Sequence, residues 1–175
     1  MDNLRKNVKI VFPIIVILQI ITNAFAQKEA LNTQQAKDMQ AIMDQVDSPL
    51  SWMVNPSIST IIGITIVGTI IGIGIAYLIC KAIYKRINSE NNDLLKDFNK
   101  NHFSIMSFKY ISLTIINLIL IFFYKQEKIF VLTAILTAIV VMITLAGANL
   151  IFNNDKYKDI KTVPNLILYG IMAIF

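Results

Sequence analysis

Five runs of this chain contain no Asp, Glu, Lys or Arg, and they constrain the fold more than any other feature. They cover residues 10–27, 48–80, 110–124, 129–154 and 162–175. A charged side chain at the centre of a bilayer costs roughly 2.5–3.5 kcal/mol on insertion scales, so membranes select such runs. A spanning helix needs about 20 apolar residues. The second and fourth runs exceed that length, the first is close to it, the third needs flanking lysines that snorkel, and the fifth is too short.

Composition also favours a membrane protein over a soluble one. Charged residues make up 15% of the chain, against about 25% in typical soluble domains. The net charge of +5 does not indicate a nucleic-acid partner, because the basic residues flank the apolar runs instead of forming a basic stripe with interleaved aromatics. We therefore predict an all-α polytopic membrane helical bundle whose main surroundings are the lipid bilayer.

The amino terminus has the pattern of a secretory signal. Three basic residues precede an apolar segment at 11–21, and Ala24 and Ala26 form the small-x-small site that signal peptidase accepts. Residues 1–26 are thus predicted to be either a cleaved signal peptide or an uncleaved first membrane helix. Both alternatives place residue 27 on the far side of the membrane.

The basic residues then predict the orientation. With the amino terminus inside, twelve of the sixteen Lys and Arg residues face the cytoplasm, six of them in residues 81–109 and three in residues 156–161. The positive-inside rule selects this orientation over its reverse. The predicted location is the bacterial inner (cytoplasmic) membrane, with several passes.

The predicted organisation has six parts. They are a signal peptide or first membrane helix (1–26), an extracytoplasmic segment (27–56), a membrane helix (57–80), a cytoplasmic amphipathic loop (81–108), a membrane helical hairpin (109–153), and a cytoplasmic turn with a partial membrane helix (154–175). Trp52 is expected to anchor the outer interface. The final helix reaches only about halfway across the core, so either it is a half-span buried against protein or the chain continues past Phe175.

Small residues on two spans suggest close helix packing. Gly68 and Gly72 are four residues apart in the second apolar run, and Ala134 and Ala138 have the same spacing in the fourth. Such pairs let another helix approach closely, either within the protein or between subunits. We expect these four residues to lie at helix contacts.

Polar residues within the spans allow a second interpretation. Asn117, Thr133, Thr137 and Asn149 lie in otherwise apolar runs. Such side chains usually face protein, where they bond across helices. Alternatively, they line a polar path in a small self-associating channel or transporter component.

The residues needed for most catalytic and cofactor sites are missing. One cysteine, Cys80, and one histidine, His102, exclude an internal disulfide, paired-histidine haem ligation and histidine–cysteine metal clusters within the chain. His102 is expected to be a solvated loop histidine, and a lipid-modifying enzyme would have to depend on it. No ionisable residue falls inside the proposed spans. We therefore expect no cofactor and no enzyme, but a structural subunit whose partners are other membrane subunits or further copies of itself.

Overall fold

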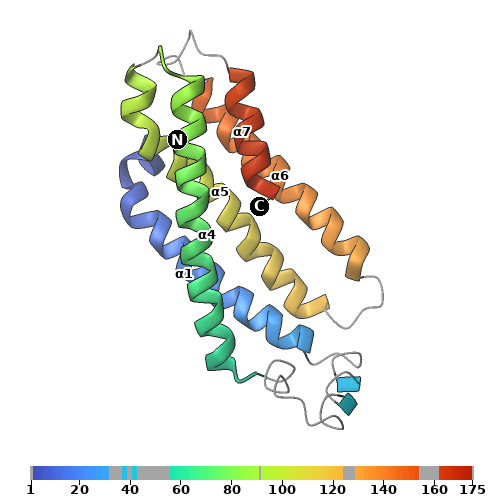
Figure 1. The fold of residues 1–175 in the computed structure, drawn as a ribbon. Coiled ribbons are helices and arrows are strands. Elements are labelled where there is room, and N and C mark those ends of the chain that lie inside the picture. The colour runs from blue at the N-terminus through green and yellow to red at the C-terminus, as the bar shows by residue number, and fades with distance from the viewer. Residues whose placement is uncertain are drawn as a thin grey trace.

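Five helices make up the described part of the protein. The computed structural model describes residues 2–31, 37–38, 41–42, 56–90, 92–123, 129–153 and 162–174. The helices are α1 (Asp2–Leu31), α4 (Ile58–Ile87), α5 (Asn92–Phe123), α6 (Ile129–Phe152) and α7 (Thr162–Ile174) (Figure 1). The first four are long and apolar enough to cross a membrane, whereas α7 is a shorter apolar helix. The chain is therefore an all-α multi-pass membrane bundle, as predicted.

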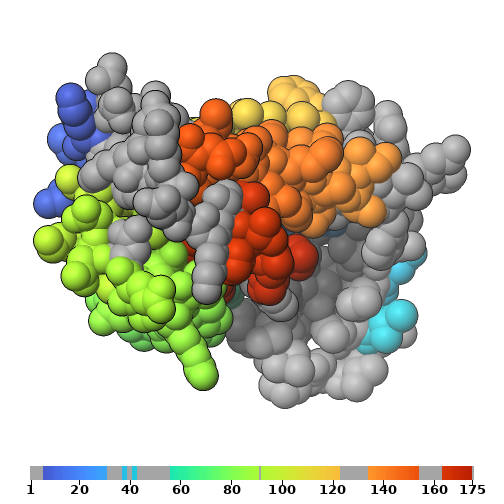
Figure 2. All heavy atoms as spheres, turned by 90° about the horizontal axis from the view of Figure 1, so that it is seen from above, coloured from blue at the N-terminus to red at the C-terminus, as the bar shows by residue number. Residues whose placement is uncertain are grey.

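The helices pack as a bundle in which α7 accompanies its neighbours over only part of their length. The α4–α5 turn and the start of α7 lie at the same end of the bundle. From this end, α7 runs alongside the part of α6 that is closest to it (Figure 1). Seen from that end, α7 lies between α6 and α4, and it packs on both (Figure 2). Its 13 residues extend about 20 Å, less than the ~30 Å hydrocarbon core.

Capping residues determine where α4 begins and where it ends. Ser57 caps its start by accepting a hydrogen bond from the backbone N–H of Thr60 at 3.2 Å. Asn88 caps its end by donating its backbone N–H to the Tyr84 carbonyl at 3.0 Å. Lys85 and Arg86 lie in the last turn, where positive charge complements the helix dipole.

Residues 81–108, expected to be a cytoplasmic loop, belong almost entirely to α4 and α5. After a short turn, α5 begins at Asn92 and continues without a break past Lys109. The apolar side chains of Leu94, Phe98 and Ile105 are buried, while the lysines of this segment remain at least partly exposed. Helices of 30 and 32 residues are about 45–48 Å long and exceed the core thickness, so charged residues can lie on them without interrupting them.

The helix α1 is an integral part of the packing. Its residues Val8, Phe12 and Ile15 form a buried cluster with Met106 and Tyr110 of α5. The Phe12 ring lies 5.8 Å from the Tyr110 ring in an edge-on arrangement. Within the structure, the segment expected to be a signal peptide or first helix therefore covers one side of α5.

The helices α5 and α6 run antiparallel and approach closely. Ile116 packs with Leu136 and Val140, while Phe108, earlier in α5, meets Gly147, later in α6. A Cβ atom added at Gly147 would lie 2.6 Å from Cδ2 of Phe108. Glycine at this position is therefore what lets the Phe108 ring rest on the α6 backbone.

Candidate functional site

Three polar contacts hold α7 in the bundle, and together we name them the α7 seat. Asn165, Tyr169 and the backbone carbonyl of Met172 lie at positions i, i+4 and i+7 of α7, so they share one helix face. Each bonds to a different residue of α4 or α5. The pairs of the α7 seat are Asn88–Asn165, His102–Tyr169 and Lys109–Met172.

The first pair joins the end of α4 to the first turns of α7. Asn88 Nδ2 donates to Asn165 Oδ1 at 3.0 Å, and Asn165 Nδ2 donates to Asn88 Oδ1 at 3.1 Å. Both side chains are buried, with 5% and 0% of their surface exposed. Asn88 Nδ2 also donates to the Tyr84 carbonyl. A reciprocal amide pair fixes the rotation of α7 because both amides must face each other.

The second pair shows that the prediction for His102 is wrong, because this residue is not a solvated loop histidine. Only 1% of this side chain is exposed. Its ring lies 5.3–5.9 Å from four aromatic rings, and its Nδ1 is 3.4 Å from the Tyr169 hydroxyl. The rings are Tyr77, Phe98, Phe103 and Tyr169. Residue 102 was expected in solvent because it was assigned to a cytoplasmic loop, yet it lies on the buried face of α5.

The third pair places an ammonium group inside the bundle. Lys109 is 7% exposed, and its Nζ donates a 2.7 Å hydrogen bond to the Met172 carbonyl. This carbonyl belongs to the last described turn of α7, where the helix dipole favours a positive charge. His102 and Lys109 are thus two ionisable side chains buried within the bundle, both on α5, which is a candidate span. In the sequence, the charge of Lys109 suggested the boundary of a membrane helix. In the folded protein, the buried Met172 carbonyl accepts a hydrogen bond from the ammonium group and stabilises it there.

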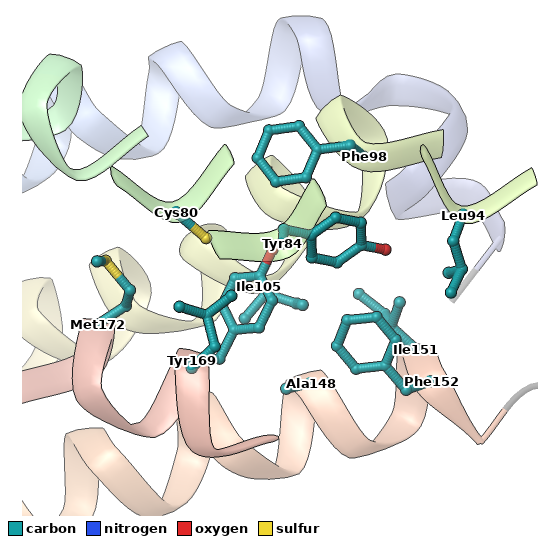
Figure 3. Close-up of a cluster of buried hydrophobic side chains, with 11 residues drawn as sticks. Cys80, Tyr84, Leu94, Phe98, Ile105, Ala148, Ile151, Phe152, Tyr169 and Met172 are labelled. Atoms are coloured by element: carbon teal, nitrogen blue, oxygen red, sulfur yellow. The ribbon is translucent and has the colours of Figure 1, made fainter. Parts of the chain in front are cut away.

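An apolar cluster surrounds these polar contacts. Tyr169 points from α7 toward Cys80 and Tyr84 of α4 (Figure 3). The Phe152 ring lies 5.9 Å from Tyr169, and Phe98 lies 4.9 Å from Tyr84. Hydrogen bonds are stronger in surroundings of low dielectric constant. The cluster and the α7 seat therefore stabilise the same helix position.

The chemistry of the α7 seat is that of a structural contact. Each of its polar groups bonds another protein group, and its histidine is enclosed by rings. Among the described residues, no three His, Cys, Asp or Glu side chains are placed to hold a metal ion. The arrangement fixes the depth and rotation of α7 in the bundle.

The structure separates the small residues predicted to pack. In the described part of the chain, nothing lies within 4 Å of a Cβ built at Gly68 or Gly72. Ala134 and Ala138 are exposed on α6. These four residues therefore make no close helix contact within the described protein. The prediction can hold only if they contact another chain.

The residues of the predicted polar path do not come together. Asn117 is buried, whereas Thr137 and Asn149 are exposed on α6. Asn149 borders an apolar groove between α6 and α7 and accepts a hydrogen bond from Asn153. The Thr133 side chain lies outside the described residues, as does Trp52.

Sequence reasoning missed the α7 seat, although one local signal was present. Asn165 and Tyr169 are the polar-tipped residues of an otherwise apolar segment, and their spacing of four predicts a shared face. Their partners lie 77 and 67 residues away, which no local pattern shows. No family model, curated protein or solved structure matches the chain. Its function must therefore be argued from its own geometry.

Proposed function

We propose that this protein is a non-catalytic subunit of a larger inner-membrane assembly and that α4 is its docking helix. The observation that carries the proposal is the exposure of α4. Only 11% of its most apolar window is buried, compared with 39–44% for the other three candidate spans. Helix packing in membranes depends on close contact, and α4 makes little of it within the chain.

The glycines of α4 mark the side on which a partner would pack. Ala76 packs against the cluster that includes Tyr169, and Gly72 and Gly68 follow one and two turns away along the same i−4 row. Both glycines are open, so a partner backbone can approach α4 closely there. The two glycines thus lie on the same row of α4 as a residue that already packs within the protein.

Replacing Gly68 or Gly72 with leucine is expected to weaken the assembly roughly tenfold, which corresponds to about 1.4 kcal/mol of lost association. The measurement is native-gel analysis of mildly solubilised membranes. Gly74→Leu is the matched control, because Gly74 is equally open but lies roughly 160° around the helix from Gly72. A wild-type protein that migrates as a lone monomer, or equal losses in all three variants, would contradict the proposal.

The channel alternative has weaker support from the geometry. Thr137 and Asn149 lie on the outer surface of α6, so they would line a path only between copies of the chain. Selective ion flux from the purified protein in liposomes, without partners, would favour the channel over the subunit.

We also infer that α1 stays in the mature protein. The orientation that we propose places the α4–α5 turn in the cytoplasm. Ala24 and Ala26 of the peptidase-like site are buried, and α1 covers the side of α5 near Tyr110. We expect the intact mass of the membrane-extracted protein to include residues 1–26. A mass that begins at Gln27 would show that the segment is a cleaved signal peptide instead.

A further inference from the structure

Cations gather where α4 ends and α5 begins. They are Lys81, Lys85, Arg86, Lys96 and Lys100. All are at least partly exposed. The same region contains three acids, Glu90, Asp93 and Asp97, so its net charge is positive. A surface of this kind attracts anions.

One of these lysines is held in place by aromatic side chains. Lys81 is partly buried, and its Nζ lies 5.3 Å from the centroid of the Tyr77 ring. That ring stacks on Phe103 of α5 at 5.7 Å and 7°, and its hydroxyl donates to Asn99 Oδ1 at 2.9 Å. The ammonium is thus held above a fixed stack at the α4–α5 boundary, next to an exposed amide.

The depth of Lys81 matches a lipid headgroup. Lys81 is 23 residues from Ile58, the first residue of α4, and that length corresponds to about 35 Å of helix. The hydrocarbon core is about 30 Å thick, so Lys81 lies near its edge when the start of α4 lies at the other. Leu78, almost one turn deeper, is 65% exposed and offers apolar surface to an acyl chain.

We propose that one part of this surface, formed by Lys81, Lys85, Lys96 and Asn99, binds an anionic phospholipid, with the headgroup phosphate on Lys81; Lys100 lies outside this part. Lys85 lies one turn beyond Lys81 on α4, and Lys96 lies one turn before Asn99 on α5, so both add positive charge beside the phosphate. A phosphate accepts charge-assisted hydrogen bonds from ammonium groups and from the Asn99 amide. A zwitterionic lipid gains less from this cluster because its own cation is repelled.

The test is native mass spectrometry of the purified full chain with phosphatidylglycerol or phosphatidylcholine. The wild type is expected to retain phosphatidylglycerol preferentially, and Lys81→Gln is expected to bind it about fivefold more weakly. Lys81→Arg should bind like the wild type, which separates loss of the cation from misfolding. Lys100→Gln is the matched control, because it removes one exposed charge about 100° around α5 from Asn99.

Three results would overturn the proposal. Equal losses for Lys81→Gln and Lys100→Gln would mean diffuse surface charge, and no loss in either would mean no site at Lys81. Equally tight binding of soluble glycerol phosphate would mean a free phosphate ligand instead of a lipid. The experiment uses the isolated protein, so its outcome is independent of whether α4 docks on a partner.

Discussion

The Asn88→Leu variant is expected to lower the free energy of unfolding by about 1–2 kcal/mol. The substitution removes both hydrogen bonds that the buried amide of Asn165 shares with Asn88, and it also removes the Nδ2 bond to the Tyr84 carbonyl. Losing a buried partner costs about 1–3 kcal/mol, and polar contacts in membrane proteins lie at the lower end of that range. Denaturant titration of the protein in mixed micelles measures the change.

The double variant makes this test specific to the pair. Asn88→Leu combined with Asn165→Leu removes both amides, so its cost is expected to be at least about 0.5 kcal/mol less than the sum of the two single costs. Asn149→Leu is the matched control, because it makes the same exchange at an exposed position of α6. Strictly additive effects, or an Asn88→Leu cost equal to that of the control, would show that the amide pair does not hold α7.

Chemical labelling of Cys80 provides a second measurement of whether the Asn88–Asn165 pair holds α7. It is the one cysteine of the chain, it is fully buried, and it lies in the same buried cluster as Tyr169 of α7. If the Asn88–Asn165 pair holds α7 in place, the Asn88→Leu variant should label faster at Cys80 with a thiol reagent. The rate reports local opening of the α7 seat, whereas the titration reports global unfolding.

The sequence was sufficient for the parts of the fold that depend on bilayer thickness. The uncharged run at 48–80 covers most of one helix long and apolar enough to span a membrane, the run at 129–154 contains another, and the final segment is a short helix. These features follow from local composition, because a bilayer requires apolar length in one continuous segment.

The α7 seat could not be predicted in the same way. Lys109 was treated as a helix boundary because an isolated charge is costly in hydrocarbon, yet its partner carbonyl lies 63 residues later in the chain. The Gly68–Gly72 spacing predicts a surface suited to packing, and both positions are open among the described residues, but the spacing does not show which chain would cover them. Composition predicts how deeply a segment inserts, whereas contacts between distant helices decide which polar groups the interior accepts.

Gly147→Leu is expected to destabilise the protein by about 3 kcal/mol or more. Even a Cβ atom at this position would lie 2.6 Å from Cδ2 and 2.8 Å from Cγ of Phe108. Cγ lies at the base of the Phe108 side chain, so relieving the clash requires a new χ1 rotamer of Phe108 or a shift of the helix. Overpacking of this kind typically costs 1–3 kcal/mol, and leucine adds three further carbons. The helix-propensity gain over glycine is only about 1 kcal/mol and does not reverse the sign.

A compensating change in α5 tests whether Phe108 is the cause. Phe108→Ala removes the ring, so Gly147→Leu in that background should cost at least about 1 kcal/mol less than in the wild type. Gly63→Leu is the control, since nothing described lies within 4 Å of its Cβ position and its effect should stay within about 0.5 kcal/mol. The same denaturant titration measures the wild type and the four variants. If Gly147→Leu is as harmless as Gly63→Leu, α5 and α6 do not approach as closely as the structure indicates. The α5–α6 hairpin, which positions Lys109 next to α7, would then have to pack differently.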